Sequence, residues 1–342
     1  MTQLATRLLV DLPNWLGDVI HALPALDTLR TANRGPTVAL APDRYVPLLQ
    51  AMGFAAESRP RRAAFAWSRA HLAGRFDTVM TARHSTRAKL LVAGTSAALR
   101  LASRGRGAAA LGLTTFRVDR SRHQRHDLDG ALTRAGAPLP PVDPLALDLL
   151  PALDRGGRLR RALIGPAPQL VALAPASRAM AAKRYPEACY AALARGLVNA
   201  GVSVAIVVGP GEEAIGRRVA APGGAVLVPT AWPLEEVAAL LAACDATVGN
   251  DSGLAHLAAV VGCPTVALFG PTDPARTAPV GPAVVVPATA HSPLTWPAPT
   301  RVAELVLGLL SGQGCAHRAP GAIMSAGGGR LAQLAEQGTL NP

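Results

Sequence analysis

Residues 249–259 of this chain read Gly-Asn-Asp-Ser-Gly-Leu-Ala-His-Leu-Ala-Ala, and residues 264–274 read Pro-Thr-Val-Ala-Leu-Phe-Gly-Pro-Thr-Asp-Pro. This pattern predicts a strand, a tight polar loop, a helix, a second strand and a second polar loop. Asp251 and Gly253 fall where the helix is expected to begin. The N–H groups of a first helical turn have no partner within the helix and lie at the positive end of its dipole, so the loop is suited to binding a phosphate. His256 is expected one turn further on, at the same mouth.

Strands alternate with helices along most of the chain. Strand-like apolar runs cover residues 7–12, 37–41, 76–81, 170–174 and 202–208. Helical patterns cover residues 187–200, 212–221 and 234–243. This alternation predicts parallel sheets covered by helices. We therefore expect an α/β fold with two Rossmann-like, doubly wound domains that face each other across a cleft.

The length of 342 residues suits two domains. Segments rich in Pro and Gly at 136–141 and 165–168 indicate the junction. We expect an N-terminal domain over 1–160 and a C-terminal domain over 161–311. The Gly- and Ala-rich tail, 312–342, is expected to be poorly ordered.

The chain is basic, with a net charge of +12 from 34 Lys and Arg against 22 Asp and Glu. Four Arg clusters, at 59–62, 100–106, 117–125 and 158–161, carry much of the excess. They reflect either solubility and composition bias or attraction to an anionic partner such as a phospholipid surface or a phosphorylated glycolipid. Nucleic acid is disfavoured, because aromatic residues make up only 4% of the chain.

The cysteines and the apolar segments bear on location. None of the four cysteines forms a C-x-x-C pair, which favours a reduced, cytoplasmic protein. The N-terminus shows no signal-peptide pattern, and no apolar run reaches the length of a spanning helix. Any membrane contact is therefore expected to be peripheral.

Two common nucleotide-binding patterns are missing from the sequence. Neither half has G-x-G-x-x-G after its first strand, which disfavours a dehydrogenase, and there is no G-x-x-x-x-G-K-[ST]. The polar loops at the predicted strand ends are the remaining candidates for chemistry, because ligands of doubly wound sheets bind there.

Several residues in these loops have both a structural and a functional interpretation. Asp18 is either a helix N-cap or a catalytic base. Lys183 and Arg184 are either solvated surface cations or neutralise a diphosphate. Glu212 and Glu213 open a helix, where acids are favoured, or hold ribose hydroxyls. His256 is either structural or part of the phosphate-binding loop.

Three ordered motifs resemble one family. Residues 12–20, Leu-Pro-Asn-Trp-Leu-Gly-Asp-Val-Ile, resemble the start of lipopolysaccharide heptosyltransferases. Residues 175–187, with Ala-Lys-Arg-Tyr-Pro-Glu at their end, are similar to the family's central segment, and residues 249–274 are similar to its C-terminal signature. The Pro-Asn-Trp-x-Gly-Asp form of the first motif is closer to the second heptosyltransferase of the pathway.

The resemblance implies a GT-B glycosyltransferase of family 9. Such an enzyme moves heptose from ADP-L-glycero-D-manno-heptose to the inner core of lipopolysaccharide with inversion, with no cofactor and no bound metal. Asp18 matches the proposed base, and Asn14, Trp15 and Gly17 match the acceptor-side loop. The residues matching the binding site for the sugar donor are Lys183, Arg184, Glu212, Glu213, Asp251, Ser252, Gly253 and His256. The alternatives are another nucleotide sugar, a GT-B-fold epimerase, and a non-catalytic sugar-nucleotide-binding protein.

Overall fold

A computed structural model describes residues 6–141, 150–177, 180–289 and 294–311. The predicted disordered tail, 312–342, lies outside the described residues. The chain divides into two compact units. The first comprises residues 1–155 together with 232–239 and 273–280, and the second comprises 156–231, 240–272 and 281–342.

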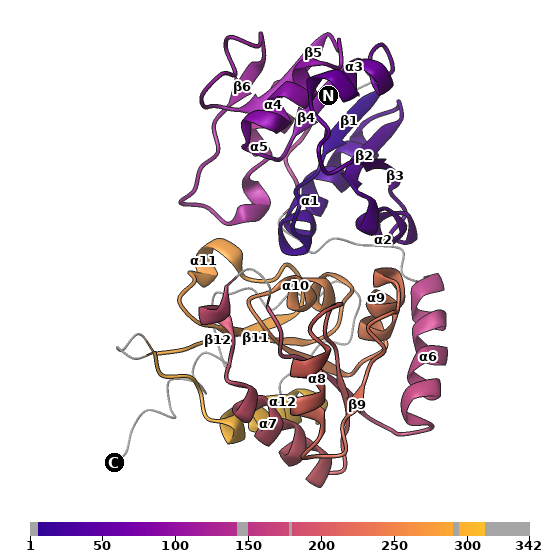
Figure 1. The fold of residues 1–342 in the computed structure, drawn as a ribbon, viewed down its shortest axis with the longest axis vertical. Coiled ribbons are helices and arrows are strands. Elements are labelled where there is room, and N and C mark those ends of the chain that lie inside the picture. The colour runs from indigo at the N-terminus through magenta and orange to yellow at the C-terminus, as the bar shows by residue number, and fades with distance from the viewer. Residues whose placement is uncertain (1–5, 142–149, 178–179, 290–293, 312–342) are drawn as a thin grey trace. The chain divides into compact units, whose positions relative to one another are not determined.

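The first unit is built on a six-stranded sheet in the order β3-β2-β1-β4-β5-β6, with every neighbouring pair parallel (Figure 1). Its strands are β1 (Leu8–Asp11), β2 (Thr37–Pro42), β3 (Ala55–Arg59), β4 (Thr78–Thr81), β5 (Leu99–Ser103) and β6 (Thr114–Phe116). Its helices are α1 (Leu16–Ala32), η1 (Asp43–Tyr45), α2 (Val46–Ala51), α3 (Phe65–His71), α4 (Thr86–Ala93), η2 (Gln124–His126), α5 (Asp129–Ala135) and α11 (Pro274–Thr277).

The second unit repeats the same topology in the order β12-β11-β10-β7-β8-β9, again parallel throughout. Its strands are β7 (Leu170–Ala174), β8 (Ser203–Ile206), β9 (Val226–Leu227), β10 (Ala246–Asn250), β11 (Thr265–Phe269) and β12 (Ala283–Pro287). Its helices are η3 (Ala181–Lys183), α7 (Glu187–Asn199), α8 (Glu213–Ala220), α10 (Gly253–Val260) and α12 (Pro299–Leu310). Helices α6 (Leu150–Ile164) and α9 (Leu234–Ala242) each contain a boundary between the units.

The predicted α/β class with two doubly wound, parallel sheets is confirmed. Central strands β1, β7, β10 and β11 are buried at every position, because both faces of a parallel sheet are covered. Tyr185 and Tyr190 are among the largest fully buried side chains and lie in the core of the second unit.

The connection between the two halves differs in detail from the prediction. The Pro- and Gly-rich segments at 136–141 and 165–168 are loops, but they flank the 15-residue helix α6. The expected boundary at residue 160 falls inside this helix, and the chain passes from one unit to the other between Arg155 and Gly156. Helix α6 carries two adjacent glycines, Gly156 and Gly157, and glycine lowers the intrinsic helix propensity of a segment.

Candidate active site

In each unit, strand order reverses between two central neighbours, β1 and β4 in the first and β7 and β10 in the second. Loops that leave the carboxyl ends of such neighbours diverge to opposite sides and create the usual ligand-binding position of a doubly wound sheet. Asp18 follows β1, Lys183 follows β7 and Asp251 follows β10. The candidate residues therefore lie at the two topological switch points.

Asp251 is the centre of a polar cluster in the second unit. Lys183 Nζ donates to its Oδ2 at 2.6 Å, and Thr272 Oγ1 donates to the same oxygen at 2.7 Å. His256 Nε2 lies 3.3 Å from Oδ1. The predicted phosphate loop, the Lys183 loop and the second polar loop thus meet on one carboxylate, and the side chain of Asp251 is only 2% exposed.

The Asp251 carboxyl is held ionised by these partners. Burial raises its pKa, but the hydrogen bonds from His256, Lys183 and Thr272 outweigh burial and hold the pKa at about 2. A carboxylate in this state fixes the ammonium of Lys183 at the end of the sheet. Asp251 therefore positions other groups and is not poised to exchange protons near neutral pH.

Helix α10 begins as predicted, with Ser252 at the N-cap and Gly253 as the first helical residue. Ser252 makes no side-chain cap, and its buried Oγ has no hydrogen-bond partner in the described part of the chain. The first-turn N–H groups lack intrahelical acceptors. This end of α10 therefore offers hydrogen-bond donors to an anion beside Lys183.

The other predicted residues of this unit have local partners. Arg184 Nε donates to the carbonyl of Ser177 at 2.9 Å, which ties the guanidinium to the loop after β7. Glu212 occupies the N-cap position of α8 without a side-chain capping bond, and its Oε2 accepts from the N–H of Gly209 at 2.9 Å. Glu213 accepts from the N–H of Gly211 at 2.9 Å, and this bond lowers its pKa. Both glutamates stand at the start of α8 and hydrogen-bond to the loop after β8.

Asn250 was not predicted as a site residue, yet it connects the two central loops. Its Oδ1 accepts from the N–H of Tyr185 at 2.9 Å and from the hydroxyl of Tyr190 at 3.2 Å, and its Nδ2 donates to the carbonyl of Pro175 at 2.8 Å. The side chain is fully buried. An amide at the end of an apolar strand, one position before Asp251, is the signal that could have identified it.

Asp18 lies in the first turn of α1, but it is not the N-cap. That position belongs to Trp15, which makes no side-chain cap, so the structural interpretation of Asp18 was wrong. Its Oδ1 accepts a hydrogen bond from Gln124 Nε2 at 2.9 Å.

Asp18 opens onto a cavity of about 360 Å³ within the first unit. Asn14 and the largely exposed Trp15 lie on the β1–α1 side of this cavity. Its charged side chains are Asp18, Arg83, Arg120, Arg125, Asp127 and Arg276. With four guanidiniums against two carboxylates, the cavity is suited to an anionic ligand. Gly17 is not among its lining residues.

A buried ion cluster supports this cavity and was missed in the sequence. Asp11, which is fully buried, lies 2.8 Å from Arg59 Nε through Oδ1 and 2.8 Å from Arg83 Nη2 through Oδ2. Arg59 also donates to Oδ1 of Asn14 at 3.0 Å. Asp11 interrupts the apolar run 8–12, and this interruption is the signal that could have identified it.

The buried Asp11 cluster also shows the environment of one arginine from the four basic segments of the sequence. Arg59 belongs to the first of the basic clusters but is buried, and burial lowers its pKa despite the attraction of Asp11. Arg160 pairs with Asp245 at 3.0 Å inside the second unit. Part of the arginine excess is therefore structural rather than available to a partner.

Within the described residues there is no cluster of three or more His, Cys, Asp or Glu side chains arranged to hold a metal ion. The same part of the chain contains no helix both long enough and apolar enough to cross a membrane.

Paired Rossmann-like units, with polar clusters at both switch points, define the chain as a member of the GT-B class of glycosyltransferase folds. The chain belongs to glycosyltransferase family 9, the heptosyltransferase family, whose model matches residues 68–295. The structure of ADP-heptose lps heptosyltransferase II from E. coli has the same fold, with a TM-score of 0.78 and 24% identity over 90% of this chain and 100% of that chain. The structure of a family 9 glycosyl transferase from Veillonella parvula superposes with a TM-score of 0.77 at 19% identity, over 91% of this chain and 99% of that one.

Curated relatives share higher identity over shorter alignments. Lipooligosaccharide heptosyltransferase 2 of Haemophilus influenzae is 38% identical over 125 residues, which are 35% of this chain and 36% of the relative. Lipopolysaccharide heptosyltransferase 2 of Salmonella typhimurium is 36% identical over 119 residues, which are 32% of this chain and 34% of the relative. The aligned part of this chain thus spans about a third of each relative's length.

Proposed function

We propose that the protein is an inverting glycosyltransferase that moves heptose from ADP-L-glycero-D-manno-heptose to the inner core of lipopolysaccharide. Family membership and the relatives named as lipopolysaccharide or lipooligosaccharide heptosyltransferases support the reaction class. The observation that carries the proposal is the position of Asp18, a carboxylate at the wall of a cationic cavity that could hold an acidic acceptor.

In this proposal the second unit binds the sugar donor. Lys183, the first turn of α10 and the Ser252 hydroxyl supply positive charge and N–H or O–H donors to the diphosphate. Arg184 adds a second cation on the same loop, and His256 supports the Asp251 carboxylate that orients Lys183. Glu212 and Glu213 are the candidates for holding the ribose hydroxyls.

The first unit binds the acceptor and removes its proton. Asp18 takes the proton from the acceptor hydroxyl as the oxygen forms a bond to the anomeric carbon. The bond from that carbon to the ADP oxygen breaks on the opposite face, which inverts the centre. ADP leaves with the electron pair, and the cations and amides of the sugar-donor site stabilise its charge. Asn14 and Trp15 contact the acceptor.

We propose that no metal ion or other cofactor takes part. The support is the chemistry of the side chains: a lysine, an arginine and helix-end amides meet the charge requirement that a divalent ion meets in other transferases. Activity measured in EDTA should equal activity in added Mg²⁺ or Mn²⁺. Loss of turnover in EDTA, restored by one of these ions, would overturn the metal-free mechanism.

The acceptor is a glycolipid, and we propose that the protein works peripherally at the inner face of the inner membrane. Exposed arginines of the first unit support this location: Arg61, Arg62, Arg104, Arg106, Arg117 and Arg120. Such cations each contribute on the order of 1 kcal/mol at an anionic surface. Co-sedimentation should be seen with vesicles containing phosphatidylglycerol and lost with phosphatidylcholine alone or in high salt.

A screen of sugar donors tests the function directly. The protein is incubated with heptose-deficient lipopolysaccharide and, in separate reactions, with ADP-heptose, UDP-sugars and GDP-sugars, with Asp18→Asn as a matched control. Transfer from ADP-heptose alone is expected, and the control should be inactive. Transfer from a UDP- or GDP-sugar alone identifies another family 9 activity, and isomerised nucleotide sugar identifies an epimerase. Sugar-nucleotide binding without turnover identifies a non-catalytic binding protein.

A further inference from the structure

The side-chain amide of Gln124 donates a 2.9 Å hydrogen bond to Oδ1 of Asp18, across 106 residues of sequence. In the described part of the chain, Gln124 is the only side chain hydrogen-bonded to this carboxylate. We propose that Gln124 is a positioning residue that holds Asp18 with one oxygen occupied and the other presented to the acceptor hydroxyl. This inference rests on the proposed function of Asp18 as the base.

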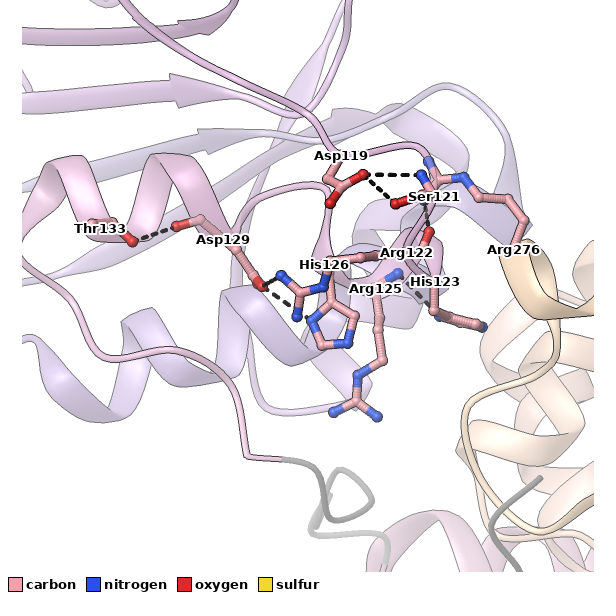
Figure 2. A network of polar contacts seen from close by, with 9 residues as sticks. All are labelled: Asp119, Ser121, Arg122, His123, Arg125, His126, Asp129, Thr133 and Arg276. Atoms are coloured by element: carbon pink, nitrogen blue, oxygen red, sulfur yellow. Dashed lines mark hydrogen bonds and ion pairs between the residues drawn. The ribbon is translucent and has the colours of Figure 1, made fainter. Parts of the chain in front are cut away.

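The segment that carries Gln124 is braced on both sides, as Figure 2 shows. Asp129, at the start of α5, accepts from Arg122 at 3.0 Å and contacts His126 at 3.1 Å. One carboxylate therefore contacts a residue before η2 and the last residue of η2. On the other side, Arg276 of α11 donates to the carbonyl of Arg122 at 2.8 Å and to Asp127 at 2.6 Å. Gln124 thus lies in a turn that side chains of both α5 and α11 hydrogen-bond.

The turn also packs directly on the helix that carries Asp18, since η2 and α1 are in extensive contact. Both Gln124 and Asp18 line the same cavity. The bond between them therefore sets the carboxylate plane at the place where an acceptor would lie. A base held in one orientation avoids the loss of rate that a freely rotating carboxylate incurs.

A neutral amide is the appropriate partner for a base in this cavity. Asp11, on the strand before, is paired with two buried guanidiniums. A guanidinium on Asp18 would stabilise its ionised form strongly and make it a poor proton acceptor. Four arginines line the same cavity, and yet the group hydrogen-bonded to Asp18 is an amide. Gln124 thereby orients the carboxylate without neutralising it.

A double-mutant cycle separates positioning from a general structural role. Gln124→Met keeps the side-chain length and removes the hydrogen-bond donor. It should lower kcat roughly tenfold while the KM for acceptor changes less than about twofold, the pattern of an interaction that matters in the transition state. In an Asp18→Asn background, measured by single turnover, the same substitution should have no further effect. Gln50→Met, on the exposed face of α2, is the matched control and should behave as wild type.

A second measurement does not depend on turnover. In full-length protein labelled with 15N-glutamine, the side-chain signal assigned to Gln124 by its loss in Gln124→Met should move in Asp18→Asn and stay in place in Asp27→Asn. If the Gln124 side-chain signal has the same chemical shift in Asp18→Asn as in wild type, the hydrogen bond between Gln124 and Asp18 is overturned. An active wild type in which Gln124→Met raises only KM, or costs as much in the Asp18→Asn background, overturns the positioning role alone. A wild type inactive with every sugar donor overturns the proposed function and, with it, the catalytic meaning of the contact.

Discussion

The ammonium nitrogen of Lys183 lies 2.6 Å from Oδ2 of Asp251, which also accepts the hydroxyl of Thr272. The pair joins the loop after β7 to the loop after β10 at the point where the strand order reverses. Lys183 remains 18% exposed while Asp251 is nearly inaccessible. The carboxylate therefore anchors a cationic side chain that remains partly exposed.

Replacing Lys183 by Ala should weaken ADP binding by roughly ten- to a hundredfold, which corresponds to the loss of one charge-assisted contact of about 1.5–3 kcal/mol. Isothermal titration calorimetry measures this effect. Arg195→Ala is the matched control, because it removes an exposed positive charge from α7 of the same unit. Unchanged affinity in Lys183→Ala would remove this residue from the site.

Acid should destabilise the second unit through Asp251. Its pKa is about 2 in the folded protein and near 3.9 in an unfolded chain, so its stabilising contribution is fully present above about pH 4 and is lost as the pH falls through 2. The shift corresponds to about 2–3 kcal/mol. Urea unfolding between pH 2 and 6 should show wild type losing this advantage over Asp251→Asn towards pH 2. A difference that stays constant with pH contradicts the prediction.

Asp18→Asn should reduce kcat by at least a hundredfold, the range expected for removal of a general base. ADP affinity and melting temperature should remain near the wild-type values, since the substitution preserves shape and Asp18 forms no ion pair among the described residues. Asp27→Asn, further along α1, provides a control on the same helix. Substantial residual activity in Asp18→Asn would assign the base to another group.

Trp15→Ala should raise the KM for acceptor about tenfold, or about 1.4 kcal/mol, with ADP affinity unchanged. The indole is 56% exposed although it lines the cavity, which leaves its apolar face available to a sugar ring. Phe65→Ala serves as the comparison, because Phe65 is also exposed but does not line the cavity. Equal effects of the two substitutions on KM would contradict a specific role for Trp15.

Asp11→Asn should lower the free energy of unfolding by about 3–5 kcal/mol, because it leaves the buried Arg59 and Arg83 without a compensating charge. The more exposed Asp27–Arg30 pair gives the contrast, with an expected cost below about 1 kcal/mol for Asp27→Asn. Chemical denaturation measures both values. Similar costs for the two variants would show that the Asp11 cluster is not a significant source of stability.

Hydrophobic periodicity, together with the Gly, Pro and polar residues that end each segment, was sufficient to predict the central elements. Apolar runs predicted β7 at its observed bounds and β1, β2 and β8 to within one or two residues at each end, and α7 and α8 were equally close. The short strands β3 and β6 and the 15-residue helix α6 were not predicted. Their conformation depends on neighbours that local sequence does not specify, for example the pairing of β6 with β5.

The sequence by itself determined the α/β class, the helix start at Ser252 and Gly253, and the placement of Asp18 and Lys183 shortly after the carboxyl ends of strands. These features follow from local patterns. Only the tertiary structure decided that Lys183, His256 and Thr272 share the Asp251 carboxylate, that Arg59 is buried on Asp11, and that Gln124 contacts Asp18. The reason is physical: strand order in each sheet decides which loops become neighbours, and hydrogen bonds between residues tens of positions apart leave no periodic trace in the sequence.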